Sequence, residues 1–142
     1  DVKTYVLGFH LVNGFVVMIE HDNDSWQDGL LNGIGGGIEN GESPLDAMCR
    51  EFLEETGLEV SGWRHLVKVG RSGIFEMDCF MSYGFDEFPP KERNDEGVLH
   101  LVDIKQPFPD NIEPTARWLL GLVLDYHHGK IDQLQVSEEW LA

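Results

Sequence analysis

Residues 36–58 read GGIENGESPLDAMCREFLEETGL, and this stretch decides the fold. Ser43 is a good helix N-cap, Pro44 suits the first helical position, and Asp46 stands where a capping box places its partner. Gly57 supplies the stop, because glycine readily takes the left-handed conformation that ends helices. The sequence therefore predicts a helix that begins at Pro44 and ends before Gly57, preceded by a glycine-rich loop.

Three carboxylates share one face of this predicted helix. Glu51, Glu54 and Glu55 lie at i, i+3 and i+4, which are neighbouring positions on a helix surface. Like charges at this spacing repel each other, so a compensating cation is the simplest reason to keep them. A solvated acidic helix face is the alternative. The helix also has an apolar face, which we expect to be buried and which consists of Leu45, Met48 and Phe52.

The groups around these carboxylates indicate a hard metal ion. Oxygen-only ligands favour Mg²⁺ or Mn²⁺ over zinc or copper. In the preceding loop, glycines let the backbone approach a ligand, and the carbonyl of Gly36 can join the ligand set. Arg50 lies four residues from both Asp46 and Glu54, so it either orients carboxylates on the helix or reaches back to Glu42.

The complete spacing from Gly36 to Leu58 resembles the signature box of the Nudix hydrolases, which cleave the diphosphate linkage of nucleoside diphosphates joined to another group. The resemblance implies an enzyme in which Mg²⁺ or Mn²⁺ binds the diphosphate oxygens and activates a water. It implies Glu51, Glu54 and Arg50 as catalytic residues, with Glu51 or Glu54 as the base. The implied metal ligands are Gly36, Glu51, Glu54, Glu55 and a residue from a later loop, for which the candidates are Glu92, Asp95 and Glu96. We choose Glu96, since it directly precedes a predicted strand.

The substrate is indicated by the residues before the box. The segment Asn32-Gly33-Ile34-Gly35-Gly36 is similar to the one in MutT-like enzymes, in which the asparagine meets a purine base. An amide can read a base edge through its donor and its acceptor, although an Asn-Gly pair is equally typical of a turn. The predicted substrate-binding residues are Asn32, Gly35, Gly37 and Asn111.

We expect a (deoxy)nucleoside triphosphate, with oxidised purines among the candidates, to be cut to the monophosphate and pyrophosphate. Markers of two other Nudix groups are missing near residues 72–74: the proline of ADP-ribose enzymes and the tyrosine of dinucleoside-polyphosphate enzymes. Paired aspartates of one oxidised-purine group are missing too. The alternatives are an ADP-ribose or nucleotide-sugar pyrophosphatase, and a Nudix-fold nucleotide-binding module without turnover.

Composition restricts the partners. The 142 residues are expected to form one domain, and 26 acidic against 10 basic residues give a net charge of −16. Such a surface repels nucleic-acid polymers and anionic membranes, so we expect a small-molecule nucleotide as partner. The sequence leaves open whether the protein forms a homodimer. No basic-then-apolar leader or membrane-length apolar run occurs, and Cys49 and Cys79 are expected to be reduced, which favours a cytoplasmic location.

The pattern of elements predicts the fold class. Asn13-Gly14 is a strong hairpin signal between two β-rich runs. A second helix is expected from Pro114 to about His128, with Trp118, Leu119, Leu122 and Val123 as its buried face. Strands are expected at residues 5–12 and 15–20, which the hairpin joins, and at residues 60–69, 74–85 and 98–104. Loops are expected at residues 22–32 and 88–96. This order indicates an α+β or α/β protein with a mixed sheet between helices, which agrees with the α/β/α sandwich and loop–helix–loop of the Nudix fold.

Overall fold

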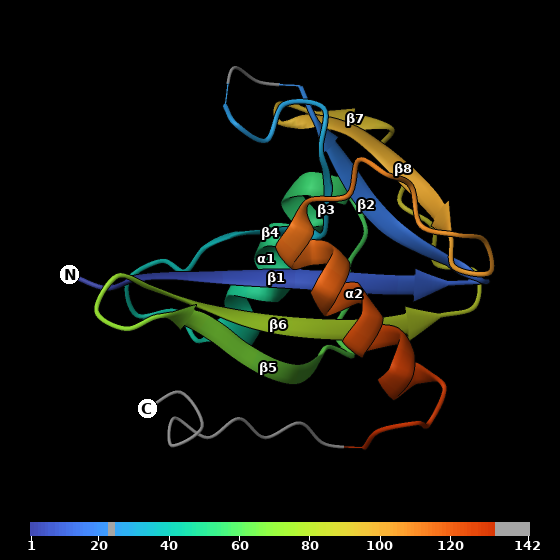
Figure 1. Cartoon of the computed structure of the whole chain (residues 1–142). Helices are drawn as coiled ribbons and strands as arrows, with labels where there is room; N and C mark the ends of the chain where they lie inside the picture. Colours follow the sequence, from blue (N-terminus) through green and yellow to red (C-terminus); the bar gives the residue numbers. More distant parts are fainter. Residues whose placement is uncertain (23–24, 133–142) are drawn as a thin grey trace.

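The computed structural model describes residues 1–22 and 25–132, and in this part of the chain one mixed sheet lies between two helices (Figure 1). The helices are α1 (Pro44–Thr56) and α2 (Pro114–His127). The strands are β1 (Lys3–Val12), β2 (Phe15–His21), β3 (Leu31–Asn32), β4 (Ile34–Gly37), β5 (Arg64–Arg71), β6 (Phe75–Gly84), β7 (Arg93–Asn94) and β8 (Gly97–Asp103). The predicted sandwich and mixed sheet are confirmed.

The sheet forks between β1 and β2. These two antiparallel strands pair only next to their turn, where Leu11 faces Val16 and Val12 faces Phe15. Further along, β4 takes over as the antiparallel neighbour of β1, while β3 pairs with β2. One arm of the fork is continued by β6, which runs parallel to β1, and by β5; the other is continued by β8 and β7. The glycine-rich segment therefore lies inside the fork.

Each helix covers its own face of the sheet. In Figure 1, α2 crosses in front of β1 and β6, and α1 lies behind them. The core on the α2 side contains Phe9, Leu11, Met18, Leu119 and Leu120. The core on the α1 side is built from Val6, Ile19, Ile34, Met48, Phe52 and Trp63. Alternate residues of β1 thus enter opposite cores, as expected for a strand covered on both faces.

Local sequence signals place α1 as predicted. The Ser43 hydroxyl accepts a hydrogen bond from the Asp46 amide at 3.1 Å, and Gly57 ends the helix with φ of 78°. The helix lies close to β1, because a Cβ atom added to Gly8 would stand 2.6 Å from the Met48 methyl carbon. Glycine at position 8 therefore sets how near the carboxylate-bearing helix approaches the sheet.

Two predictions about buried faces are wrong in part. Trp118 is 55% exposed, and the core-facing stripe of α2 is instead Ala116, Leu119, Leu120 and Val123, at i, i+3, i+4 and i+7. Leu122 packs only at the edge of that core. Leu45 is 44% exposed, since it lies in the first turn of α1, outside the stripe of Ala47, Met48 and Phe52.

The strand predictions hold apart from their ends and the shortest strands. The hairpin at Asn13-Gly14 is confirmed, with positive φ at both residues. The strand expected over residues 60–69 is β5, which begins later, at Arg64. The predicted loops at 22–32 and 88–96 contain the two-residue strands β3 and β7, and the glycine segment forms β4.

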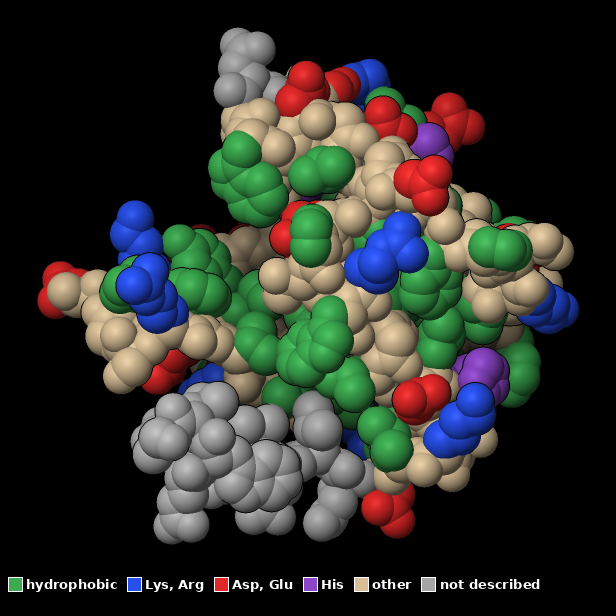
Figure 2. Space-filling view, viewed as in Figure 1, with side chains coloured by type: hydrophobic (Ala, Val, Ile, Leu, Met, Phe, Trp, Pro, Cys, Tyr) green, Lys and Arg blue, Asp and Glu red, His purple; other side chains and the backbone are tan. Residues whose placement is uncertain are grey.

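The surface is acidic without one dominant patch on the α2 side. Figure 2 shows Asp and Glu side chains spread over this face, with hydrophobic side chains exposed among them. Both cysteines are free, and burial raises the pKa of the Cys79 thiol to about 12, which makes it unreactive. Among the described residues, no helix combines the length and apolar character needed to span a membrane.

Candidate metal and nucleotide site

Arg50 organises the acidic face of α1. Its Nε and Nη2 donate to the two carboxylate oxygens of Glu42, at 2.8 and 3.0 Å. Its Nη1 donates to Glu51 at 3.0 Å and to Glu54 at 3.3 Å, and Nη2 also donates to the carbonyl of Gly37 at 3.0 Å. Both roles predicted for Arg50 therefore occur together: it orients helix carboxylates and it reaches back to Glu42.

The charges of this network stabilise one another. The hydrogen bond from Arg50 lowers the pKa of the Glu42 carboxyl, and the same pair raises the pKa of the Arg50 guanidinium. A paired, two-pronged contact of this kind fixes geometry as well as charge. Arg50 consequently locks the glycine-rich loop onto the helix.

Glu51 lies directly against the glycine loop. A Cβ atom added to Gly36 would overlap the carboxylate oxygens of Glu51, so the missing side chain of Gly36 makes room for this carboxylate. Burial raises the pKa of Glu51, and the neighbouring Arg50 partly offsets that effect. A half-buried carboxylate with a raised pKa is better suited to accept a proton near neutral pH than a solvated one.

Glu55 and Glu96 come together from distant parts of the chain. Glu55 is 7% exposed, and its Oε2 atom has no hydrogen-bond partner in the described structure. Burial, followed by the nearby Glu96, raises the pKa of Glu55 to about 10. Glu96 lies in the two-residue turn between β7 and β8, and both glutamates line a cavity of about 260 Å³ with Gly36. The structure thus brings the chosen loop residue to the helix carboxylates.

The residues of this cavity fit a divalent cation in their chemistry. Glu55, Glu96 and Gly36 line the cavity, and the Glu51 carboxylate lies against Gly36 outside that lining. The three carboxylates and the Gly36 carbonyl offer only oxygen atoms, as Mg²⁺ and Mn²⁺ prefer. The Oε2 atom of Glu55 is buried without a partner in the described structure, and burial followed by the nearby Glu96 raises the pKa of this carboxyl, so a cation there would stabilise its charged form. In the described part of the chain, no three His, Cys, Asp or Glu side chains are already arranged as a metal site.

A larger cavity of about 590 Å³ adjoins the acidic one. The two share Tyr5, Leu7, Gln27, Asn32 and Met77 in their walls. The residues that line only the larger cavity are Trp26, Val69, Gly70, Phe75, Glu113 and Thr115. Trp26 is 73% exposed, so it is not a core residue. An acidic pocket therefore continues into a wider pocket with aromatic walls.

Asn32 lies where the two cavities meet. Its Oδ1 accepts from the Gly33 amide at 2.8 Å, and its Nδ2 donates to Gln27 at 3.1 Å. The first bond is the local turn contact considered for an Asn-Gly pair. An amide has two N–H groups and two lone pairs, so one of each remains for a ligand.

The other predicted residues divide between the site and its surroundings. Gly35 lines the acidic cavity, whereas Gly37 contributes its carbonyl to Arg50. Asn111 donates to the carbonyl of Gly29 at 3.0 Å and lines neither cavity. The side chain of Glu92 is exposed and also lies outside these cavities.

Sequence reasoning missed two residues of the cavity walls, Gln27 and His21. Gln27 lies in a polar loop without periodicity, and nothing local distinguishes it. His21 ends β2, and its Nδ1 atom is buried without a hydrogen-bond partner in the described structure. The alternation of β2, which places His21 on the side of Ile19, was the available signal.

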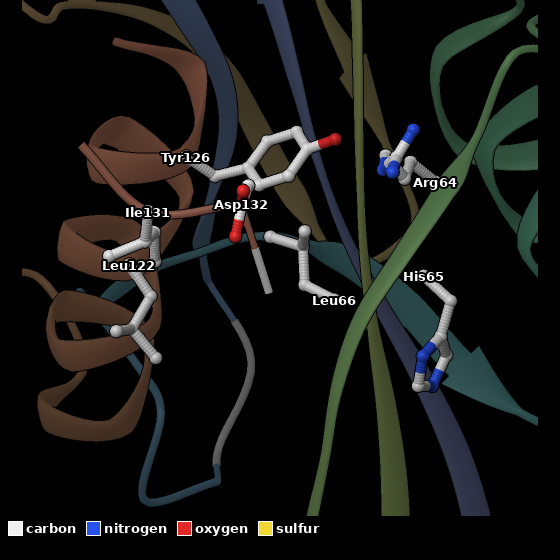
Figure 3. Close-up of a pocket in the computed structure, with 7 residues that line it drawn as sticks. All are labelled: Arg64, His65, Leu66, Leu122, Tyr126, Ile131 and Asp132. Atoms are coloured by element: carbon white, nitrogen blue, oxygen red, sulfur yellow. The ribbon is translucent and has the colours of Figure 1, made fainter. Parts of the chain in front are cut away.

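Another cavity, of about 210 Å³, lies between β5 and α2 and shares no residue with the site (Figure 3). The Arg64 guanidinium stands 5.0 Å from the centre of the Tyr126 ring, a cation–π contact that joins the strand to the helix. The described lining of this cavity contains none of the three glutamates of α1. The candidate metal site therefore lies at the cavity in the fork of the sheet.

We expect Glu96→Gln to lower kcat by more than about tenfold, because the change removes a charge that faces Glu55 across the acidic cavity. Glu92→Gln is the matched control from the same loop, and because its side chain lines neither cavity we expect a change within about twofold. Steady-state kinetics with saturating Mg²⁺ measure both. Equal, small effects of the two substitutions would assign Glu96 to ordinary surface charge.

Comparison with known proteins identifies the family. The model of the NUDIX domain matches residues 3–120, and the chain therefore belongs to the Nudix hydrolase family. The confirmed α/β/α fold and the box on α1 agree with this membership.

Three similar proteins illustrate the range within the family. An RNA pyrophosphohydrolase of Rhizobium meliloti (strain 1021) is 36% identical over an alignment of 63 residues, and the match covers 35% of this chain and 38% of that protein. The structure of a MutT NUDIX hydrolase from Burkholderia pseudomallei is 19% identical with a TM-score of 0.74, over 87% of this chain and 98% of that one. A bifunctional NMN adenylyltransferase/ADP ribose pyrophosphatase from Francisella tularensis, complexed with AMP and a manganese ion, is 17% identical with a TM-score of 0.70, over 88% of this chain and 42% of that one. The structural matches define the fold, and the first relative is matched over well under half of its length.

Proposed function

We propose that the protein hydrolyses a (deoxy)nucleoside triphosphate to the monophosphate and pyrophosphate, with Mg²⁺ or Mn²⁺ as cofactor. The observation that carries the proposal is the continuity of the two cavities through Asn32 and Gln27. One end offers carboxylate oxygens for metal-bound phosphates, and the other offers aromatic walls for a base. The distribution of charge and aromatic groups along this path matches that of a nucleotide.

The box residues have distinct parts in the proposed reaction. A divalent ion, when bound, neutralises phosphate charge and lowers the pKa of a coordinated water. Glu51, Glu55, Glu96 and the Gly36 carbonyl are its proposed ligands, with Glu54 completing the set from the exposed side of the helix. Glu51 is also the proposed base, since its burial beside Gly36 and its raised pKa suit proton transfer from water. Arg50 keeps Glu51 and Glu54 oriented toward the loop.

Base recognition is assigned to the shared wall of the cavities. Asn32 retains an N–H group and a lone pair toward the cavity, and Gln27 beside it supplies a second amide. Trp26 and Phe75 line the wider cavity, where an aromatic ring can stack on a base. Gly35 lets the backbone approach the phosphates, while Asn111 supports the loop that contains Gly29 instead of touching the base.

An ADP-ribose pyrophosphatase is the second candidate. The wider cavity is favourable to it, because about 590 Å³ also admits a ribose with its attached groups, and the Francisella tularensis protein named above belongs to that class. The net charge of −16 makes a long RNA substrate the weaker choice, since the surface repels a polyanion. A binding module without turnover is a third outcome of the same assay.

We expect Asn32→Ala to reduce the ratio of kcat/KM between the best and the poorest base. The accompanying decrease of kcat on the poorest substrate should be smaller than that reduction. A site that hydrogen-bonds a base edge discriminates because a wrong base leaves buried polar groups unpaired. The measurement is kcat/KM for several triphosphates, an oxidised purine triphosphate, ADP-ribose and a nucleotide sugar, in wild type and variant.

The same assay includes a chelator arm and a matched control. Exhaustive chelation should abolish turnover, and Mg²⁺ or Mn²⁺ should restore it. Asn40→Ala, in the exposed part of the loop before α1, should keep the wild-type profile. A wild-type preference for ADP-ribose would favour the second candidate, and full turnover after chelation would rule out the metal mechanism.

A further inference from the structure

One side chain anchors the turn that carries Glu96 to the helix that carries Glu55. The Asn94 Nδ2 atom donates to the main-chain oxygen of Glu55 at 2.9 Å. Its Oδ1 atom accepts from the main-chain N–H groups of Glu96 at 2.8 Å and Gly97 at 3.2 Å. A single amide group thus connects the backbones of the two residues whose carboxylates face each other in the acidic cavity.

The turn around this amide is tightly constrained. Asn94 faces Gly97 across the β7–β8 pair, which leaves Asp95 and Glu96 as the two turn residues. A Cβ atom added to Gly97 would overlap the main-chain oxygen of Glu20, so the start of β8 lies hard against β2. The turn is therefore fixed on one side by the sheet and on the other by Asn94.

We propose that Asn94 is a positioning residue, which sets the distance between the Glu96 and Glu55 carboxyl groups and so the affinity of the pair for a divalent cation. The cation part of this inference rests on the proposed function, whereas the anchoring of the turn does not. An amide is suited to the task because it donates in one direction and accepts in another from one rigid plane. Groups that hold metal ligands in place commonly contribute about 10- to 100-fold to metal affinity.

Lys91 offers a matched comparison within the same loop. Its Nζ atom donates to the main-chain oxygen of Glu54 at 2.8 Å, and its main-chain N–H donates to Thr56 at 3.2 Å. The side-chain bond ties the loop to the end of α1 as the Asn94 bond does, but it does not reach Glu96. Lys91→Met therefore loosens the loop while leaving the amide contacts of Asn94 intact.

The test compares Asn94→Ala, Asn94→Asp and Lys91→Met in the full chain. The probes are Mn²⁺ alone, titrated by electron paramagnetic resonance, and the exchange of the Glu96 and Gly97 amide protons, followed by NMR without metal. We expect Asn94→Ala to weaken Mn²⁺ binding by about 10- to 100-fold and to speed exchange at both amides. Asn94→Asp keeps the acceptor and should keep the amide protection. Lys91→Met should change Mn²⁺ affinity by less than about threefold.

Two results would overturn the proposal: unchanged amide exchange in Asn94→Ala, or an equal loss of Mn²⁺ affinity in Lys91→Met. If Asn94→Ala does not fold, Asn94→Asp decides, because it lacks the N–H donor to the Glu55 main-chain oxygen: unchanged Mn²⁺ affinity in this variant would contradict the positioning role. A wild-type protein that binds Mn²⁺ and hydrolyses no nucleotide would refute the proposed function and leave the positioning role standing. A wild type that binds no Mn²⁺ would refute the proposed affinity effect.

Discussion

Glu51→Gln is expected to lower kcat by about 10²–10⁴, the usual range for loss of a positioned base or charge stabiliser. The carboxylate lies against Gly36 and accepts from Arg50 at 3.0 Å, so it is held where the loop and helix meet. Glutamine keeps the size of the side chain and removes its charge and basicity. Folding should be nearly unchanged, because Glu51 is not among the buried residues of α1.

Three measurements separate this role from a general loss of charge. The decrease of kcat in Glu54→Gln should lie in the same range as that in Glu51→Gln, since both carboxylates accept a hydrogen bond from Arg50. Glu59→Gln, which changes an exposed glutamate just beyond α1, is the control and should stay within about twofold of wild type. Circular dichroism and thermal unfolding verify the fold of each variant. Wild-type kcat in both Glu51→Gln and Glu54→Gln would refute the assignment of the box face to catalysis.

Glu55→Gln is expected to stabilise the metal-free protein by about 1–3 kcal/mol at pH 7.5. Burial and Glu96 raise the pKa of Glu55 to about 10, above the value of 4.5 that an unperturbed glutamate has. Between these values the folded state holds a proton that the unfolded state releases, so rising pH lowers the free energy of unfolding. Glutamine resembles the protonated form of Glu55, so the free energy of unfolding of the variant does not decrease in this way as pH rises.

Thermal unfolding with a chelator at two pH values measures this effect. At pH 7.5 the Tm of Glu55→Gln should exceed that of wild type by about 3–10 °C, and at pH 4.5 the difference should largely disappear. Mg²⁺ should raise the Tm of wild type more than that of the variant, because the variant lacks a proposed ligand. Glu59→Gln again serves as the control. A variant that is less stable than wild type at pH 7.5 would contradict a raised pKa of Glu55 in the folded state.

Features that depend on neighbouring residues could be predicted from the sequence. The limits of α1 follow from Ser43, Pro44 and Gly57, and the shared face of its glutamates follows from helical spacing. Glu96 could be chosen because it directly precedes β8. The buried face of α2 was predicted correctly at Leu119 and Val123. It wrongly included Trp118 and Leu122, which are as apolar as the buried Leu120.

Features that depend on residues distant in the sequence could not be predicted from it. β3, β4 and β7 are two to four residues long, too short for a period to be recognised, and pairing with β1, β2 and β8 defines them. Asn94 lies in a charged loop, and its partner Glu55 is 39 residues away in sequence. Gln27 gains its place only because β3 brings Asn32 beside it. Such roles become visible only when the chain is folded.

In the proposed function, the forked sheet separates the residues that would select a ligand from those that would act on it. The segment with Trp26, Gln27 and Asn32 belongs to the arm of β2, whereas the catalytic helix packs behind the arm of β1. Direct pairing of β1 with β2 is confined to two residue pairs beside the Asn13-Gly14 turn. Substitutions in the first segment can therefore accumulate without disturbing Arg50 and its carboxylates, which gives natural variation a route to new substrates while the hydrolytic chemistry is inherited unchanged.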